Sequence, residues 1–283
     1  MRPRGGIIGA TVQPAASAVN SAASGVWTLR EAEALKRAGT WPTYLESPTQ
    51  IAGLQLWLDA ADGSTLFDAT AGGSLVAVDG TVKRWQDKSG NQRHCTEFGS
   101  GPQRKAAQIN GRGVVRFNGT NTQLSGTSTP GGGNARTTFV VAKANTSSGG
   151  ELLQLGANLL GGAGFLHRAG HFSGNTLIGG DLYTNNLIIS GTELPVTSAF
   201  VGCIVQASRS SFQYFHNAAS YSVTGTLNSF SMNEGYFVGA LRGSSSFGFY
   251  DGDIGEIIVY DAALSSSNRV AVEAYLISKW GIT

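Results

Sequence analysis

The acidic residues of this 283-residue chain are the first candidates for chemistry. Retaining hydrolysis of a glycosidic bond needs two carboxyl groups about 5–5.5 Å apart, and alternate positions on a β-strand place side chains on one face. An E-x-D-x-x-E pattern would meet that need, but the sequence has none, and Asp251-x-Asp253-x-x-Glu256 comes nearest. We interpret it as a turn followed by a strand carboxylate and predict no catalytic residues. Three further glutamates stand isolated: Glu151, Glu193 and Glu234.

Three aspartates close together could hold a hard cation. Asp59, Asp62 and Asp68 lie within the stretch LDAADGSTLFD, and Ca²⁺ takes six to eight oxygen ligands. The loop pattern D-x-[DN]-x-[DN]-G is missing. Two interpretations stay open, a calcium site at these three residues or aspartates that only form turns.

Sugar binding needs an exposed aromatic ring beside amides or carboxylates, because a sugar has an apolar C–H face and a polar edge. Residues of these types are more often core or turn residues, which is the favoured alternative for each candidate. Gly-rich stretches at 131–133 and within 147–180 predict loops, where binding sites of such folds often lie. The candidates are Trp85, Tyr183 with Asp181 and Asn185, and Tyr250 with Asp251.

The elements that would position these residues are short strands. The chain has 40 glycines and 13% charged residues, against a usual glycine share of about 7% and charged share of about 25%. Apolar runs alternate with turn signals such as Asn110-Gly111 and Asn118-Gly119. This pattern predicts an antiparallel β-sandwich. The predicted strands lie in 51–60, 82–94, 113–119, 137–144, 151–156, 164–172, 176–184, 186–191, 199–208, 211–218, 235–241 and 254–260.

Two helices are predicted at the ends of the sandwich. In WTLREAEALKRAG (27–39), Thr28 and Glu31 have capping-box spacing and Gly39 supplies a stop. Near the C-terminus, 264–268 forms a helix start, an apolar stripe runs through Val272, Tyr275 or Leu276, and Trp280, and Gly281 ends the helix. We expect the C-terminal helix to cap the sandwich. The first helix either packs on its own sandwich or docks on a larger assembly.

Bulk properties exclude several other functions. The net charge of +2 gives no reason to expect nucleic-acid binding, and no run of about 18 apolar residues predicts membrane insertion. No secretory signal is evident at the N-terminus, whose Gly-rich apolar stretch is too short. Cys95 and Cys203 are expected to be buried free thiols, with a single disulfide as the alternative.

Three stretches resemble the laminin-G-like branch of the concanavalin A-like lectin/glucanase superfamily. They are GLQLWLDAADGSTL (53–66) with WQDKSGNQRH (85–94), GVVRFNG (113–119) with TTFVVAKA (137–144), and GDIGEIIVYDAALSSSNRVAVEAYLISKWG (252–281). The resemblance covers roughly residues 50–283 and implies a jelly-roll sandwich with possible calcium. Family members often carry Phe-Asp-Gly where this chain has Phe117-Asn118-Gly119, which weakens the calcium hypothesis.

The N-terminal part resembles leader segments of tailed-phage virion proteins, on GGIIG and GVWTLREAEALKRAGTWP (25–42). The resemblance implies that an arm and helix at 1–48 precede a sandwich at 49–283, and that residues 1–45 contact other virion proteins. The attachment residues would be Trp27, Leu29, Leu35 and Trp41.

We therefore expect a non-enzymatic capsid-decoration, fibre or tail-associated protein on the particle surface, with a lectin-like outer domain that binds host-surface glycans. Symmetric assembly is common, and a homotrimer is favoured. The alternatives are a bacterial extracellular carbohydrate-binding module and, less favoured, a glycoside hydrolase or lyase.

Overall fold

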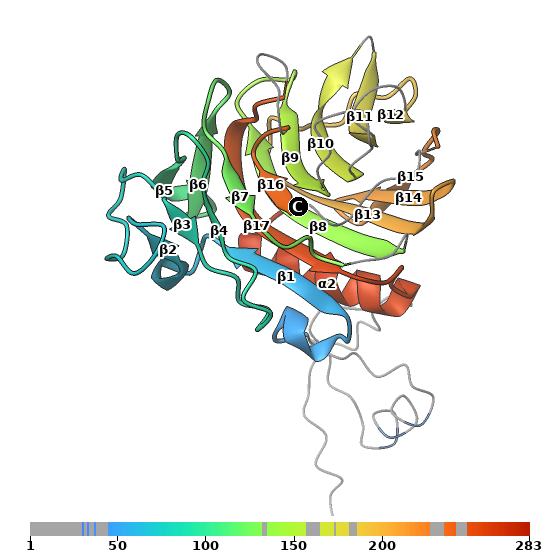
Figure 1. The fold of residues 1–283 in the computed structure, drawn as a ribbon. Helices are drawn as coiled ribbons and strands as arrows, with labels where there is room; N and C mark the ends of the chain where they lie inside the picture. The colour runs from blue at the N-terminus through green and yellow to red at the C-terminus, as the bar shows by residue number, and fades with distance from the viewer. Residues whose placement is uncertain are drawn as a thin grey trace, which may run out of the picture.

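The computed structural model describes residues 45–131, 135–156, 165–172, 174–180, 186–226, 235–241 and 248–283, together with residues 30, 33 and 37. Over this part of the chain, two antiparallel sheets pack face to face and a C-terminal helix lies on the outside of one of them (Figure 1). The predicted all-β sandwich is confirmed.

The first sheet, called sheet A, lies next to the helix. Its strand order is β15-β14-β13-β8-β17-β6-β5, and β1 also pairs with β17. The run TTFVVAKA lies in β8, between β13 and β17, as expected of a central strand. The strands are β1 Leu54–Asp59, β5 Gln103–Ile109, β6 Arg112–Asn118, β8 Arg136–Ala144, β13 Phe200–Ser208, β14 Ser211–His216, β15 Ala219–Tyr221 and β17 Asp251–Tyr260.

The second sheet, called sheet B, forms the opposite layer. Its order is β12-β11-β10-β9-β16-β7-β4-β3-β2. Two single-turn 3₁₀ helices, η1 Pro48–Gln50 and η2 Gly63–Thr65, flank β1. The strands are β2 Leu66–Phe67, β3 Arg84–Trp85, β4 Cys95–Glu97, β7 Leu124–Gly126, β9 Gly150–Leu155, β10 Phe165–Phe172, β11 Asn175–Gly180, β12 Asn186–Ile189 and β16 Tyr236–Val238.

Side chains that alternate along the strands fill the space between the sheets. Leu56 and Leu58 point into this core and Trp57 to the other side of sheet A. The side chain of Leu54 points to the opposite face from that of Leu56, because the pairing register shifts between the two residues. Ile254 and Glu256 also lie on opposite faces, since another register shift separates them. Each irregularity adds one residue and reverses the alternation.

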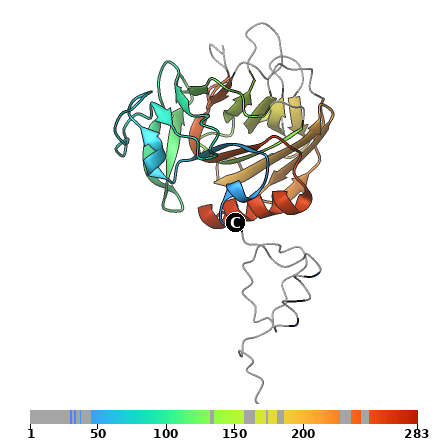
Figure 2. The same cartoon turned by 60° about the horizontal axis from the view of Figure 1, so that its bottom comes forward.

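Helix α2 (Ser266–Trp280) covers the outer face of sheet A (Figure 2). The Ser265 side chain accepts a hydrogen bond from Asn268 N, and Gly281 ends the helix in the left-handed conformation at φ 58°. The predicted cap and stop are therefore confirmed. The buried stripe contains Leu276, and Tyr275 is only partly buried.

A buried carboxylate fastens this helix to the sheet. Glu256 of β17 accepts hydrogen bonds from Trp57 Nε1 at 2.7 Å, Trp280 Nε1 at 2.7 Å and Lys279 Nζ at 2.7 Å. The ring of Trp280 lies against Gly255, where an added Cβ would come within 2.7 Å of it. A side chain at position 255 would push the helix away.

The chain joins the sandwich beside α2. Leu45 and Ile51 are buried in the cluster under the helix, and Tyr260 donates a hydrogen bond from its hydroxyl to Pro48 O at 2.9 Å. Of the predicted helix at 27–39, residues 30, 33 and 37 are described and are helical, with an Arg37–Glu33 ion pair at 2.8 Å. The rest of that prediction lies outside the described residues. So do the attachment residues Trp27, Leu29, Leu35 and Trp41.

Cys95 and Cys203 are buried free thiols, as predicted. They lie in different clusters, Cys95 between the sheets and Cys203 under the helix. Burial raises the pKa of the Cys95 thiol to about 12. Among the described residues, no helix has the length and apolar character to cross a membrane.

We expect Trp280→Ala to lower the free energy of unfolding by about 3–5 kcal/mol, because it removes a fully buried ring and leaves a cavity. Phe98→Ala is the control, since that ring is 52% exposed and its loss should cost less than about 1 kcal/mol. Chemical denaturation followed by tryptophan fluorescence and circular dichroism measures both. Equal losses would contradict the role given to the helix contact.

Candidate functional site

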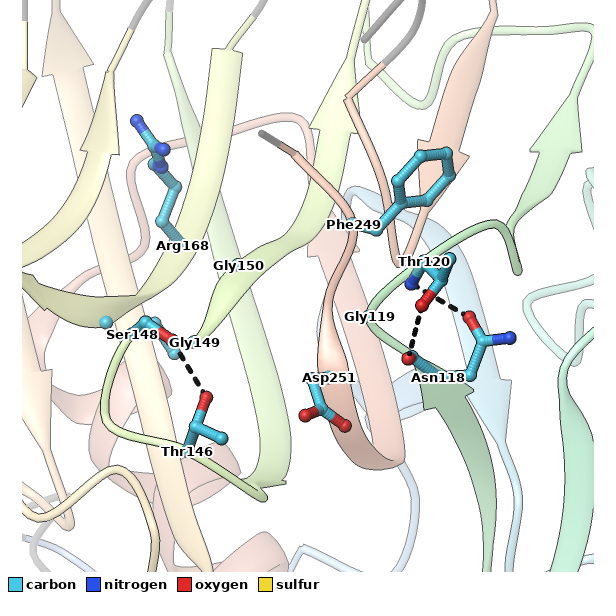
Figure 3. Close-up of a pocket in the computed structure, with 12 residues that line it drawn as sticks. Asn118, Gly119, Thr120, Thr146, Ser148, Gly149, Gly150, Arg168, Phe249 and Asp251 are labelled. Carbon is cyan, nitrogen blue, oxygen red and sulfur yellow. Dashed lines mark hydrogen bonds between the residues drawn. The ribbon is translucent and has the colours of Figure 1, made fainter. Parts of the chain in front are cut away.

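A cleft of about 460 Å³ opens at one end of the sandwich (Figure 3). It lies between the loop after β6, the loop between β8 and β9, strand β10 and the start of β17. Its lining is mostly glycine and hydroxyl residues, with one aromatic ring, one cation and one carboxylate. The lining residues are Asn118, Gly119, Thr120, Thr146, Ser148, Gly149, Gly150, Arg168, Ala169, Gly170, Phe249 and Asp251.

Glycines allow the walls of the cleft to approach one another. A Cβ on Gly149 would lie 1.4 Å from Ala169 O, and one on Gly170 would lie 2.3 Å from Ser148 O. Gly149 also has φ +55°, which side chains rarely adopt. Two backbone hydrogen bonds hold the same loop, Gly149 N to Thr146 O at 3.2 Å and His171 N to Ser147 O at 2.7 Å.

The amide of Asn118 shapes the loop after β6. Its Oδ1 accepts from the backbone N–H groups of Thr120, Asn121 and Thr122, at 3.0–3.2 Å. Its Nδ2 donates to Asn121 Oδ1 at 2.8 Å. This oxygen is therefore already used within its own loop and serves to position Thr120 at the cleft.

Asp251 and Phe249 come from the segment that enters β17. Asp251 accepts a hydrogen bond from Asn145 Nδ2 at 2.7 Å, and Asn145 N donates to Asp251 O at 2.9 Å. This double contact fixes the carboxylate at the start of β17. The ring of Phe249 is half-buried on the same wall.

The opposite wall carries the cation. Arg168 Nη2 of β10 lies 2.7 Å from Glu151 Oε1 of β9, with the arginine side chain 22% exposed and the glutamate 1% exposed. Burial raises the pKa of Glu151 to about 7, and Arg168 offsets part of that rise. In Figure 3, Arg168 and Asp251 come from different walls.

This set of groups can bind a polyhydroxylated ligand. Carboxylate and hydroxyl oxygens accept or share hydrogen bonds with ligand hydroxyls, the guanidinium donates, and the phenyl ring offers an apolar surface.

Two of the three aromatic candidates for a sugar platform do not lie at this cleft. Trp85 and Tyr250 are both fully buried in the core between the sheets, so the sugar-binding hypothesis is wrong for these two and the core alternative is confirmed. Tyr250 lies between Phe249 and Asp251 but turns inward, because successive residues of an extended chain point to opposite sides. Asp181, Tyr183 and Asn185 lie outside the described residues.

The predicted calcium site at Asp59, Asp62 and Asp68 is not found. Lys88 Nζ lies 3.0 Å from Asp59 and 2.8 Å from Asp62, and it holds the pKa of Asp62 below its usual value. The Asp68 carboxylate accepts from Ser74 N at 2.7 Å. Ion pairs with Lys88 thus account for Asp59 and Asp62, and a turn hydrogen bond accounts for Asp68. Within the part of the chain that the structure describes, no three His, Cys, Asp or Glu side chains gather as a metal site.

The Asp251-x-Asp253-x-x-Glu256 carboxylates are dispersed. Asp251 faces the cleft, Asp253 is buried and lies 2.6 Å from Arg116, and Glu256 lies under α2.

Comparison with known proteins identifies the fold. No protein-family model matches the sequence, and neither does any curated protein. Domain 4 of AbnA, a GH43 extracellular arabinanase from Geobacillus stearothermophilus in complex with arabinotriose, matches with a TM-score of 0.56 and 12% identity, over 78% of this chain and 98% of that domain. Trypanosoma rangeli sialidase in complex with sialic acid matches with a TM-score of 0.53 and 11% identity, over 81% of this chain and 33% of the sialidase. At these identities the likeness concerns the β-sandwich fold.

We expect Gly149→Ala to destabilise the protein more than Gly174→Ala. Both glycines have positive φ, but an added Cβ meets Ala169 O at Gly149 and nothing within 4 Å at Gly174. The control should cost about 1–2 kcal/mol from its backbone conformation alone, and Gly149→Ala should exceed it because the backbone must also move. Thermal unfolding measures the melting temperatures of both variants. Equal decreases would show that the backbones at Gly149 and Ala169 are not closely packed.

Proposed function

We propose that this protein is a non-enzymatic glycan-recognition module whose rim cleft binds part of an oligosaccharide. The composition of the cleft carries the proposal. Phe249 offers a surface for the apolar face of a sugar ring, and Asp251 with Thr146 and Ser148 offers partners for hydroxyl groups. The fold is shared with a domain from an arabinanase that was solved with arabinotriose bound, which supports a sugar as the ligand.

The absence of an enzymatic role is part of the proposal. Of the three carboxylates nearest to a hydrolase pattern, Asp253 is ion-paired to Arg116 and Glu256 accepts hydrogen bonds from two indoles. Neither is free to exchange a proton with a ligand in the cleft. Asp251 has no carboxylate partner from that pattern.

The cleft lies far from the N-terminal junction, the place where residues 45–51 join the sandwich. This supports a module that is held at one end and binds its ligand at the other. Strand β17 begins with Asp251 at the cleft and ends with Tyr260, whose hydroxyl contacts Pro48. Its ten residues span about 30 Å at the usual rise of a strand. Ligand cleft and N-terminal junction therefore lie at opposite ends of one strand.

We further propose that residues 1–45 attach the module to a tailed-phage virion, where it would act as a homo-oligomeric decoration, fibre or tail-associated protein. The resemblance of 25–42 to virion leader segments supports this attachment. The placement of the cleft and the N-terminal junction at opposite ends of β17 supports it as well. The second candidate is a bacterial extracellular carbohydrate-binding module. It would use the same cleft and differ in what the N-terminal segment contacts.

We expect Asp251→Ala to weaken glycan binding about tenfold or more, because it removes a hydrogen-bond acceptor with a charge. Asp79→Ala is the matched control, since its exposed carboxylate pairs with Lys105 away from the cleft. A glycan array finds the ligands, and calorimetry then compares the variants. Equal affinities for the two variants would place binding elsewhere, and turnover of a bound glycan by the wild type would refute the non-enzymatic role.

We expect deletion of residues 1–44 to leave the sandwich folded and its glycan affinity unchanged, because Leu45 and all described strands remain. The truncated protein should fail to assemble onto virions produced in its absence. Sedimentation of particles with bound protein measures this. Assembly of the truncated chain would overturn the attachment role of the segment.

A further inference from the structure

The Arg168–Glu151 ion pair lies on the cleft wall, with the cation at the cleft surface and the carboxylate buried behind it. Arg168 lines the cleft and is 22% exposed, whereas Glu151 is 1% exposed and does not reach the cleft surface. The two are partners in the β9–β10 register at the point where that register shifts. Because directly opposite residues of an antiparallel pair point to the same face, both side chains lie on one side of sheet B.

The buried carboxylate is only half satisfied by the described residues. Its Oε1 faces Arg168, but its Oε2 is buried with no hydrogen-bond partner. The backbone around Gly248 and Leu241 closes over it, since a Cβ on Gly248 would lie 3.2 Å from Oε2. A charged oxygen in that position is poorly solvated, which favours the protonated acid.

We propose that Arg168 and Glu151 form a pH-sensitive subsite that binds the carboxylate of an acidic sugar when Glu151 is protonated. This inference rests on the proposed function, since it assigns a ligand class to the same cleft.

The charge balance gives the direction of the effect. While Glu151 is ionised, it neutralises Arg168 and repels an incoming carboxylate. Once Glu151 is protonated, the guanidinium is left with uncompensated charge and can pair with the ligand in its place. Because burial raises the pKa of Glu151 to about 7, affinity for acidic sugars should rise as the pH falls through neutrality.

The other wall supplies a partner for the rest of such a ligand. Asp251 would repel a second anion but can accept a hydroxyl hydrogen bond, so a sugar acid would place its carboxylate at Arg168 and hydroxyl groups toward Asp251. Figure 3 shows these two residues on separate walls of the cleft. A neutral sugar could contact the Asp251 wall but would have no group to replace Glu151.

Other titratable groups near the cleft must be distinguished from Glu151. Asp251 lies on the opposite wall, and His171 lies further along β10, with its Nδ1 3.6 Å from Glu193 Oε2. Burial raises the pKa of Glu151, and Arg168 is the charged group, among the residues that the structure describes, that lowers it.

The test compares matched sugars with the full chain. Calorimetry would measure galacturonic acid against galactose, and glucuronic acid against glucose, at about pH 5.5 and about pH 8, on either side of the Glu151 pKa. A ligand carboxylate that raises that pKa by about one unit should bind about fivefold more tightly at the lower pH. The neutral sugars should show no such change.

Two variants assign the effect to the pair. Glu151→Gln should bind the acids at pH 8 as tightly as the wild type does at pH 5.5, and should lose the pH dependence. Glu273→Gln is the matched control, because Glu273 is also buried beside an arginine and has its pKa raised to about 7, but belongs to helix α2. It should keep the wild-type pH profile.

A stability measurement reports Glu151 without any ligand. Its pKa lies above the unfolded value of about 4.3, so the free energy of unfolding should fall as the pH rises from that value to about 7. Glu151→Gln should flatten part of this slope.

The outcomes separate the two proposals. Binding of neutral sugars, with acids no tighter at low pH, would overturn the acidic subsite and leave glycan recognition standing. A pH dependence that survives in Glu151→Gln would overturn the role of Glu151. A folded wild type that binds no glycan on the array would overturn the proposed function itself.

Discussion

The arrangement of this molecule depends on one buried carboxylate. Glu256 is fully enclosed, yet hydrogen bonds from Trp57, Trp280 and Lys279 reach its two oxygens. Removing a charge from water is costly unless its partners replace the lost hydration, and these donors come from both the sheet and α2. The site therefore accepts one placement of the helix on the sheet. Lys279 also pairs with Asp59, which in turn pairs with Lys88, so the same constraint extends to the loop after β3.

Much of the fold follows from patterns that are local in the sequence. The central strand β8 is a continuous run of β-branched and aromatic residues, and helix α2 has Ser265 and Gly281 at its ends. The face that a residue takes is harder to predict where a strand carries an extra residue. The shifts after Leu54 and Ile254 depend on the partner strand, and a sequence read alone contains no sign of which residue will be left unpaired.

The cleft was harder to predict because its residues come from four separate segments. From the sequence, Asn118 is a weakened calcium position and Glu151 an isolated glutamate. Asp251 is both a turn residue and a sugar-binding candidate beside Tyr250, and it does line the cleft. Arg168 carried no pattern that distinguishes it from a surface arginine on a strand. The glycines at 149 and 170 were the available signal, since small residues mark a close approach of two backbones. Trp85 and Tyr250 were candidates because of their residue type alone. A large aromatic side chain is compatible both with an exposed sugar-binding surface and with the core.

The orientation of β17 has a mechanical consequence. A ligand held near Asp251 and a tether that enters beside Tyr260 would pull on opposite ends of the same strand. Hydrogen bonds between antiparallel strands lie perpendicular to the strand axis, and β17 is bonded along its length to β8, β1 and β6. A force along that axis loads these bonds together in shear, whereas a force across it would open them one after another.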